Sequence, residues 1–322
     1  MEKAELRIVF MGTPEFAVGT LSALVEGGYN VVAVVTQPDK PVGRHGSVLQ
    51  PSAVKQYAMQ HGIDVLQPEK MKDELFLSEL RAYKADLQVV VAFRMLPEVV
   101  WAMPRYGTFN VHASLLPQYR GAAPINWAII NGETETGVTT FFLDHDIDTG
   151  RIISQKRFAI PDDANVEYVY DGLMKLGAQL CLETVDTILS TGGNPPTMEQ
   201  AAVAVGQLKP APKIFKDTCM IDWQQPAKAV CDFVRGLSPV PGAWTTLVDE
   251  NGRETVLKIF SARKTLTAGQ GSGTIVAEGK RLLISASDNC LEILELQLAG
   301  KKRMAAADFL NGMKGICGCS VK

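Results

Sequence analysis

The sequence predicts an α/β domain with a doubly wound, mostly parallel sheet, followed by a small β-barrel domain. Three observations predict this architecture. Apolar strand-like segments alternate with helical segments over the first 190 residues, a pattern typical of parallel sheets with helices on both faces. A Pro-rich segment at 207–212 then has the composition of a linker. Beyond it, short apolar segments recur about every ten residues, which favours a barrel.

The chain length also supports two domains. A chain of 322 residues is long for one domain, and a hydrophobic content of 46% is ample for two packed cores. We therefore expect the α/β domain at 1–190, a linker at 191–212 and the barrel domain at 213–322.

The first strand–helix–strand unit sets the pattern of the α/β domain. An apolar strand at 6–10 leads to Thr13 and Pro14, which are suited to cap a helix and to open it. The Gly27-Gly28 pair ends that helix, and an apolar strand follows at 31–36. The turn lacks a G-x-G-x-x-G fingerprint, so a nicotinamide-dependent oxidoreductase is not supported.

The segment 37–50 interrupts the alternation. Its first ten residues hold two Pro, two Gly and three potential cations, which include Lys40 and Arg44. We expect an exposed loop here. A loop of this length inside a compact domain is more often functional than not, although a surface loop without a function is the simpler alternative.

Apolar periodicity predicts the other elements of the α/β domain. Helices are predicted at 52–61, 73–83, 97–103, 124–131 and 166–190. Strands are predicted at 62–66, 87–93, 137–143 and 152–155, and a further strand begins at Phe109.

The C-terminal part has a different pattern. A helix is predicted at 227–237 and a short one at 306–313. Between them, strands are predicted at 243–248, 255–262, 273–276, 282–286 and 291–297. Five strands at this spacing fit an OB-like barrel, a fold that often binds nucleic acid.

The net charge of −3 is unevenly distributed. From Lys209 onward, 16 Lys and Arg stand against 11 Asp and Glu, a net charge of +5, whereas the residues before Lys209 carry −8. A basic module on an acidic body suggests a polyanionic partner, with chance variation as the alternative. Lys301, Lys302 and Arg303 form a triple cation beside a barrel strand, either as a phosphate contact or as a solvated basic turn.

Several other classes of protein are not supported. The charged N-terminus has no apolar signal core, and no apolar run approaches membrane-spanning length. The six cysteines match neither zinc nor thioredoxin spacing, so we expect a cytoplasmic protein with reduced thiols. Cys317 and Cys319 are expected in a frayed tail, with a metal or redox role as the alternative. No sustained heptad suggests an oligomer, so a monomer is expected.

The run from Phe109 to Gly121 contains the clearest candidates for chemistry. Asn110 and His112 lie two residues apart on a predicted strand and therefore share a face. Asn supplies an N–H donor, and His gives or takes a proton near neutral pH. On these two residues alone, a buried histidine and a structural asparagine are the simpler interpretation.

Three acidic residues in five follow the predicted strand at 137–143. Asp144, Asp146 and Asp148 repel one another unless a cation or hydrogen-bond donor lies nearby. An exposed turn is the alternative. Asp148-Thr149-Gly150 also occurs in aspartic proteases, but here it appears once and in an α/β context.

These motifs resemble, nearly end to end, those of the 10-formyltetrahydrofolate-dependent formyltransferases, on the branch that acts on methionyl-tRNA. The motifs that carry the resemblance are Met11-Gly12-Thr13-Pro14-Glu15-Phe16, Thr36-Gln37-Pro38-Asp39-Lys40-Pro41, Asn110-Val111-His112, Ser114-Leu115-Leu116-Pro117, Tyr119-Arg120-Gly121-Ala122-Ala123-Pro124-Ile125, Gly137-Val138-Thr139, Asp148-Thr149-Gly150, Ile221-Asp222-Trp223 and Gly300-Lys301-Lys302.

The resemblance implies a Rossmann-like formyltransferase domain, a linker and an OB-like tRNA-binding domain. It implies formyl transfer from 10-formyltetrahydrofolate to the α-amino group of the methionyl moiety of initiator Met-tRNA, without a metal. The implied catalytic residues are Asn110, His112 and Asp148, with Asp148 chosen over Asp144 and Asp146 because it carries the family's Asp-x-Gly pattern.

The resemblance also implies binding residues. Ser114, Leu115, Leu116 and Pro117 form part of the implied folate site. The loop that carries Lys40 and Arg44 is implied to engage the acceptor end of the tRNA, and Lys301, Lys302 and Arg303 are expected to neutralise phosphates.

Other functions remain open at this point. A related enzyme could formylate a nucleotide sugar or glycinamide ribonucleotide, or hydrolyse the folate donor, although the basic barrel argues against each of these. The chain could also be a catalytically idle RNA-binding module.

Overall fold

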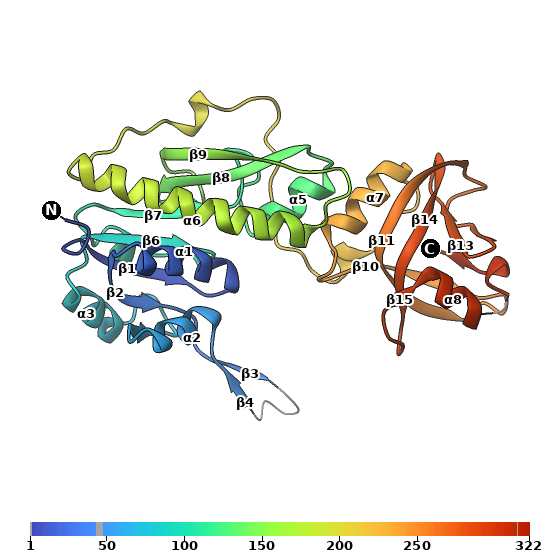
Figure 1. The fold of residues 1–322 in the computed structure, drawn as a ribbon, viewed down its shortest axis with the longest axis horizontal. Helices are drawn as coiled ribbons and strands as arrows, with labels where there is room; N and C mark the ends of the chain where they lie inside the picture. Colours follow the sequence, from blue (N-terminus) through green and yellow to red (C-terminus); the bar gives the residue numbers. More distant parts are fainter. Residues whose placement is uncertain (1, 43–47, 314) are drawn as a thin grey trace. The chain divides into compact units, whose positions relative to one another are not determined.

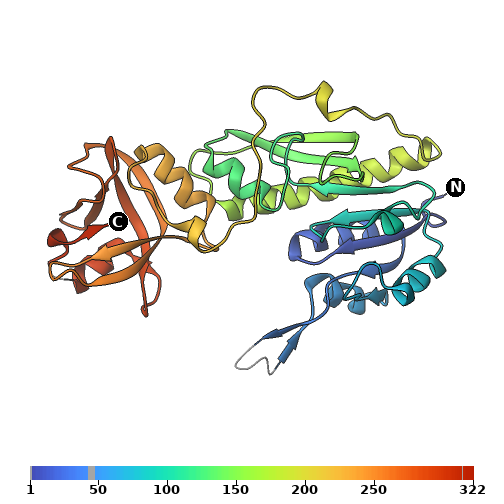
Figure 2. The same cartoon turned by 180° about the vertical axis from the view of Figure 1, so that it is seen from behind.

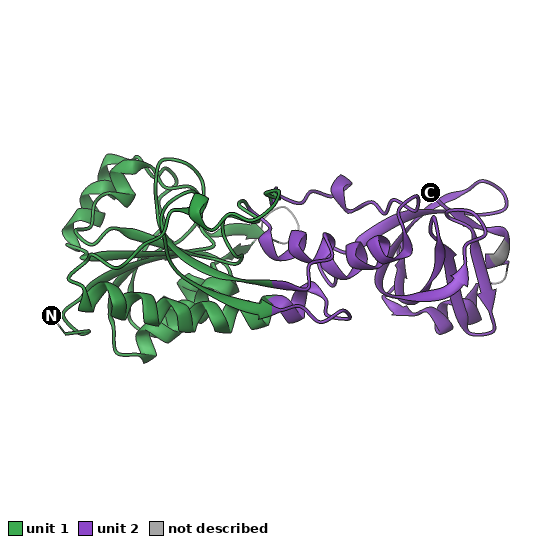
Figure 3. Ribbon diagram, turned by 90° about the horizontal axis from the view of Figure 1, so that it is seen from above, with its two compact units in different colours: residues 1–121, 136–158, 170–210 green, residues 122–135, 159–169, 211–322 purple. Residues whose placement is uncertain are grey.

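The computed structural model describes residues 2–42, 48–313 and 315–322, except for the side chain of Cys317 (Figure 1). Contacts divide the chain into two compact units, which Figure 3 colours separately. Unit 1 holds residues 1–121, 136–158 and 170–210, and unit 2 holds residues 122–135, 159–169 and 211–322.

Unit 1 is built on a seven-stranded sheet of order β5-β2-β1-β6-β7-β8-β9. Its strands are β1 Arg7–Gly12, β2 Asn30–Val35, β5 Asp64–Leu66, β6 Leu87–Val91, β7 Thr108–His112, β8 Glu135–Phe142 and β9 Ile152–Ala159. The pairs from β5 to β7 are parallel, and β8 pairs with β7 in the antiparallel direction. The mostly parallel sheet predicted from the sequence is confirmed.

Helices cover both faces of this sheet, as Figures 1 and 2 show from opposite sides. They are α1 Glu15–Glu26, α2 Ala53–Gln60, α3 Glu74–Ala82, α4 Glu98–Trp101 and α6 Val166–Ser190. Val9, Met11 and Val90 pack with α3 and α4 on one face, while Ile8 and Phe10 alternate with them and are buried on the other. Because both faces are covered, the central strands are apolar throughout.

The first helix begins differently from the prediction. Pro14 occupies the N-cap position of α1 in an extended conformation, and no side chain caps the helix. Thr13 lies one residue too early to cap it, and its buried hydroxyl has no hydrogen-bond partner among the described residues. By contrast, Ser52 and Asp73 cap α2 and α3 by accepting bonds from Lys55 N and Phe76 N, each at 3.1 Å.

The predicted loop at 37–50 is partly a hairpin. Strand β3 (Lys40–Val42) pairs antiparallel with β4 (Val48–Gln50), and every residue of both strands is exposed. Figure 1 shows this hairpin projecting from the body of unit 1. These short exposed strands have no apolar-polar alternation, which is why the sequence pattern did not predict them. Arg44 lies outside the described residues.

Unit 2 is a curled antiparallel sheet with two helices packed on it and a third helix packed against one of these two. The strands are β10 Ala243–Val248, β11 Glu254–Ala268, β12 Ile275–Glu278, β13 Arg281–Ser285, β14 Asn289–Leu298, β15 Met304–Ala305 and β16 Ser320–Val321. The helices are α5 Pro124–Ile130, α7 Ala227–Gly236 and α8 Ala306–Gly312. Irregularities in the β11–β14 register bend these long strands, so the sheet curls as the barrel prediction requires.

The last strand joins the two ends of this curled sheet. Strand β16 pairs with β10, and Ser320 also bridges to Thr274 beside β12. Val321 N–H donates to the carbonyl oxygen of Gly273 at 2.9 Å. The expectation of a frayed tail is therefore wrong, and Cys319 is buried.

In the described parts of the chain we find no helix with the length and apolar content that crossing a bilayer requires.

Gly273→Ala tests the junction made by the last strand. Gly273 has φ +83°, and a Cβ atom there lies 2.2 Å from the carbonyl oxygen of Val321. We expect a loss of about 2–4 kcal/mol in unfolding free energy, from backbone strain plus the collision. Gly252→Ala is the matched control, because Gly252 has φ +77° and no neighbour within 4 Å. The loss in this control measures the backbone strain alone, which we expect to cost about 1 kcal/mol. Equal losses for both variants in urea unfolding would contradict the tight junction.

Candidate active site

Strand β7 places two polar side chains on one face of the central sheet. Asn110 pairs with Val90 on β6 and Phe141 on β8, and His112 pairs with Thr139. Residues two apart in a strand point the same way, so the Asn110 amide and the His112 imidazole lie side by side. His112 is 6% exposed, so its ring can contact only a small group that enters the site.

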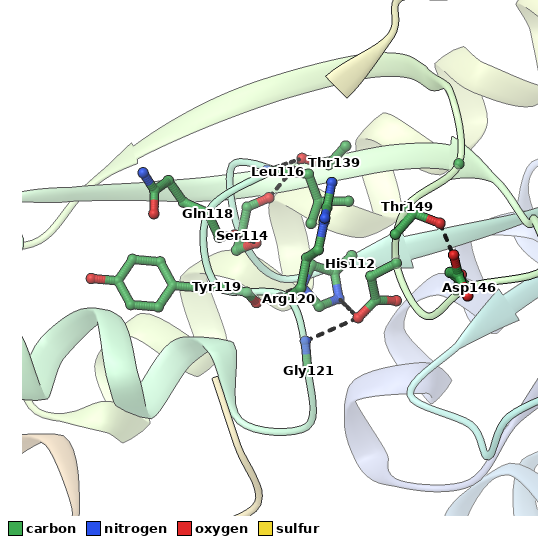
Figure 4. A network of polar contacts seen from close by, with 12 residues as sticks. His112, Ser114, Leu116, Gln118, Tyr119, Arg120, Gly121, Thr139, Asp146 and Thr149 are labelled. Carbon is green, nitrogen blue, oxygen red and sulfur yellow. Dashed lines mark hydrogen bonds and ion pairs between the residues drawn. The ribbon is translucent and has the colours of Figure 1, made fainter. Parts of the chain in front are cut away.

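The backbone determines which ring nitrogen of His112 carries a hydrogen (Figure 4). Its Nε2 lies 3.0 Å from the carbonyl oxygen of Tyr119. A carbonyl oxygen only accepts, so Nε2 carries the hydrogen in this contact. The nitrogen that can gain or lose a proton is therefore Nδ1, and it faces Asp148.

Asp148 reaches His112 through a loop and not through the sheet. Because β8 is antiparallel to β7, its pairing with β7 runs from Thr139 beside His112 to Phe142 beside Phe109. The β8–β9 connection must fold back to bring the Asp148 carboxylate to 3.8 Å from His112 Nδ1. Gly150 permits this return, since a Cβ there lies only 1.8 Å from the carbonyl oxygen of Phe142.

The Asp148 carboxylate is held by a backbone donor. Gly121 N–H donates to Asp148 Oδ2 at 3.0 Å, so one carboxylate oxygen faces both Gly121 and His112. The Asp148 side chain is 12% exposed, whereas Asp144 and Asp146 are exposed. Of the three acidic residues in this loop, Asp148 is the one that lies next to His112.

Asn110 has an unused polar atom. Its Oδ1 is buried and accepts no hydrogen bond within the described residues. A buried acceptor without a donor costs about 1–3 kcal/mol, which a ligand N–H or O–H can recover. The side chain is therefore suited to receive a group that enters beside His112.

The predicted folate-binding residues form a rigid turn. Ser114 is fully buried, and its hydroxyl donates to the carbonyl oxygen of Gln118 at 2.7 Å. Leu116 and Pro117 are buried, and Leu115 is half-buried. A role of these residues in binding folate stays a prediction.

One buried threonine holds this turn in shape (Figure 4). The Thr139 hydroxyl accepts from Leu116 N–H at 3.1 Å and donates to the carbonyl oxygen of Ser114 at 2.7 Å. Gln155 Nε2 donates to the same hydroxyl at 2.8 Å and to the carbonyl oxygen of Leu116 at 2.9 Å. Strands β8 and β9 thus position a turn that follows β7.

The sequence did not reveal these supporting groups. Tyr119, Gly121 and Thr139 lie within the motifs that carry the family resemblance, but no role was assigned to them. Tyr119 acts through its carbonyl oxygen and Gly121 through its N–H, and no side-chain pattern predicts such backbone roles. Gln155 is in a predicted strand and carries no motif.

The segment expected as a linker is also ordered within unit 1. Met198 forms backbone hydrogen bonds with Ile152 in both directions, each at 2.8 Å. Gln118 Nε2 donates to the carbonyl oxygens of Val205 and Gln207, and Gln118 Oε1 accepts from Lys209 N–H. The expected domain limits at 190 and 212 stay a prediction.

The base of the exposed hairpin is anchored just before Lys40. Asp39 accepts from Lys55 Nζ and from Gln67 Nε2, each at 2.7 Å. The Lys55 ammonium, with help from Gln67, lowers the pKa of the Asp39 carboxyl. Lys40 itself is exposed, and its predicted contact with tRNA stays a prediction.

The three cations of the basic turn at 301–303 differ in their contacts. Lys301 and Lys302 are exposed, and neither makes an ion pair with any residue that the structure describes. Arg303, in contrast, pairs with Glu295 and lies 4.3 Å from the ring centre of Phe260. Its charge is therefore partly neutralised, and the two lysines are the better candidates for binding a polyanion.

Neither metal nor disulfide chemistry is indicated by the described residues. No group of three or more His, Cys, Asp or Glu side chains among them could hold a metal ion. Cys181, Cys219, Cys231 and Cys290 are free and buried, and Cys319 is buried.

Comparisons with known proteins agree with this architecture. The formyl transferase family model matches residues 6–185, and the model of the formyl transferase C-terminal domain matches residues 213–314. The chain is 62% identical to the methionyl-tRNA formyltransferase of Parabacteroides distasonis over 318 residues, 98% of each chain. It is 60% identical to the Bacteroides thetaiotaomicron enzyme of the same name over 316 residues, again 98% of each.

Solved structures share the fold at low identity. An N-formyltransferase from Helicobacter canadensis, in complex with folinic acid and dTDP-3-aminofucose, has a TM-score of 0.63 at 19% identity. The match covers 94% of this chain and all of that one. HypX from Aquifex aeolicus, in complex with tetrahydrofolic acid, has a TM-score of 0.62 at 20% identity. This match covers 94% of this chain and 46% of the HypX chain.

Thr139→Val tests the support of the turn at 114–117. The variant keeps the shape of the side chain but leaves Leu116 N–H, Gln155 Nε2 and the Ser114 carbonyl oxygen without their shared partner. We expect a loss of about 1–3 kcal/mol in unfolding free energy by urea denaturation. Thr139→Ser, which keeps the hydroxyl, should lose less. The reverse order would mean that the methyl group, and not the hydroxyl, supports the turn.

Proposed function

Because the chain belongs to the methionyl-tRNA formyltransferase family, we infer that it transfers a formyl group from formyltetrahydrofolate to the α-amino group of initiator Met-tRNA. The product is formylmethionyl-tRNA for translation initiation. The observation that carries this inference is the 62% identity over 98% of both chains. The enzyme is a one-carbon transferase that takes folate and tRNA as substrates.

The reaction makes three demands on the site. A neutral amine attacks the formyl carbon, so a C–N bond forms while the carbonyl oxygen becomes negative. The bond from that carbon to N10 of the folate then breaks. The amine must lose one proton and N10 must gain one. A site for this reaction therefore needs a donor for the oxyanion and groups that move protons.

Asn110, His112 and Asp148 are proposed to meet these demands. An N–H of the Asn110 amide stabilises the oxyanion, and its unpartnered Oδ1 accepts from a donor on the substrate. His112 Nδ1 and the Asp148 carboxylate take up the proton that the amine loses and supply the proton that N10 gains. The support for this assignment is that the Tyr119 carbonyl oxygen accepts from Nε2, while Nδ1 lies 3.8 Å from Asp148 Oδ2.

The turn at 114–117 is proposed to bind the 10-formyl isomer of the donor. Its support is the rigidity of the turn, which Thr139 and Gln155 hold beside β7. A rigid turn costs little ordering entropy when a ligand binds. No metal is required, because the leaving nitrogen can be protonated and the oxyanion can be bound by an amide.

The tRNA is proposed to contact exposed basic residues. Lys301 and Lys302 neutralise phosphates, and Arg303 contributes less because it pairs with Glu295. Lys40 and Arg44 probe the acceptor end. We also propose that the protein acts as a monomer in the cytoplasm.

A sugar formyltransferase is the second candidate. The fold of the Helicobacter canadensis N-formyltransferase is similar, but at 19% identity the likeness concerns the fold alone. Supplying 10-formyltetrahydrofolate with Met-tRNA, or with a dTDP-amino sugar, separates the two candidates. Formylation of the sugar and not of Met-tRNA would refute the proposed function.

Asn110→Ala, His112→Ala and Asp148→Ala test the catalytic assignment. We expect Asn110→Ala to lower the rate by about two to three orders of magnitude, the usual effect of removing an oxyanion donor. The other two should also lose most turnover, because proton transfer fails. The measurement is single-turnover formylation of Met-tRNA, with tRNA binding measured separately and expected to stay roughly unchanged. Activity that survives all three changes would place the active site elsewhere.

Charge reversal at Lys301 and Lys302 tests the tRNA contact. The double variant K301E/K302E should raise the KM for Met-tRNA and flatten its salt dependence, because each lost phosphate contact lowers the log–log slope by roughly 0.7–0.9. Lys280→Glu reverses a charge on another exposed turn of unit 2 and serves as the control. An unchanged slope in the double variant would mean that the polyanion binds elsewhere.

A further inference from the structure

Gln200 is an almost completely buried amide in the segment that follows α6. It begins the short 3₁₀ helix η2 (Gln200–Ala202) and is 3% exposed. Its Nε2 donates to the carbonyl oxygens of Asp148 at 2.8 Å and Gly150 at 2.9 Å. Its Oε1 accepts from Arg120 Nε at 3.0 Å and Nη2 at 2.6 Å. Both donors and both acceptor positions of the amide are used.

These four bonds join the two loops that build the candidate active site. Asp148 and Gly150 belong to the β8–β9 connection. Arg120 lies between Tyr119, whose carbonyl oxygen holds His112 Nε2, and Gly121, whose N–H holds the Asp148 carboxylate. Gln200 therefore links the backbone of Asp148 to the residue between the two groups that orient His112 and Asp148.

The joined loops need support because their backbones are strained. Tyr119 has φ +60° and Asp148 has φ +56°, in the left-handed region that side chains with a Cβ rarely adopt. Each such residue costs about 1–3 kcal/mol and persists only where its surroundings hold it in place. Gln200 bonds directly to the carbonyl oxygen of the strained Asp148, and it holds the side chain of Arg120, which follows the strained Tyr119.

The segment that carries Gln200 is anchored independently of this side chain. Met198 and Ile152 exchange backbone hydrogen bonds, and Arg151 Nε donates to Thr197 Oγ1 at 2.7 Å. Arg151 also forms an exposed ion pair with Glu199. Removing the Gln200 amide should therefore loosen the two loops without releasing the segment.

We propose that Gln200 is a positioning residue for formyl transfer, which holds the Asp148 carboxylate in its position facing His112 Nδ1. This proposal rests on the proposed function, because it assigns Asp148 a part in proton transfer. The Gln200 amide is fully used in bonds to Asp148, Gly150 and Arg120, so its effect on the reaction passes through these residues. A misplacement of about 1 Å at a reacting group can lower a rate roughly a hundredfold.

Gln200→Met tests the proposal, because methionine has a similar length but cannot make the four hydrogen bonds. We expect kcat for Met-tRNA formylation to fall about ten- to a hundredfold, with both KM values within about twofold of wild type. Gln200→Glu keeps an acceptor for Arg120 and loses both N–H donors, so it should also be slow. It replaces Gln200→Met as the test if that variant does not fold.

The control is Glu199→Gln, which weakens the neighbouring exposed ion pair to Arg151 and leaves the Gln200 bonds in place. It should keep kcat within about twofold of wild type. A comparable loss in this control would show that any disturbance of the segment slows the enzyme, and would overturn the specific role of Gln200.

A second comparison separates positioning from general damage. In an Asp148→Asn background, Gln200→Met should reduce kcat by less than about twofold further, because the group it positions has already lost its function. If the fold losses in kcat of the two single variants multiply in the double variant, the proposal is overturned. If Asp148→Asn is slow but Gln200→Met has wild-type kcat, this inference fails and the proposed site stands. If Asp148→Asn has wild-type kcat, the catalytic assignment fails, and the inference with it.

Discussion

The hydrogen bond from His112 Nε2 to the carbonyl oxygen of Tyr119 decides what the rest of the site can do. It fixes the proton on one ring nitrogen and turns the other toward Asp148. The 3.8 Å from Nδ1 to the carboxylate is too long for a hydrogen bond, so the two groups are close but not bonded. A histidine held in this way is oriented by the backbone and remains able to exchange a proton.

The antiparallel addition of β8 shapes the surroundings of that histidine. A parallel strand would bring its carboxyl end beside the end of β7, where ligands usually bind in open α/β sheets. Here the pairing of β8 with β7 begins beside His112, so Thr139 supports the turn at 114–117 while Asp148 returns through a loop. The site therefore depends on two loops that must be held relative to each other.

The sequence predicted the parts of the molecule that depend on apolar periodicity and on local motifs. The mostly parallel sheet, α6 at 166–190 and the curled second sheet were predicted, and so was the proximity of Asp148 to His112. The failures have different causes, some local and some dependent on partners far away in the chain. Thr13 does not cap α1, an exposed hairpin replaces part of a loop, and the last strand is secured by Gly273. Gln200 lies 52 residues from Asp148, and nothing near it in the sequence marks it.

The position of β16 has a consequence for how unit 2 is made in the cell. During translation, β10 to β14 leave the ribosome before β16, yet β16 is the strand that links β10 with Gly273 and Thr274. The sheet cannot acquire this last connection while the chain is still growing through residue 321. The two edges of the sheet must therefore stay exposed until synthesis has passed that point. Until then, these edges can pair with other chains or bind chaperones.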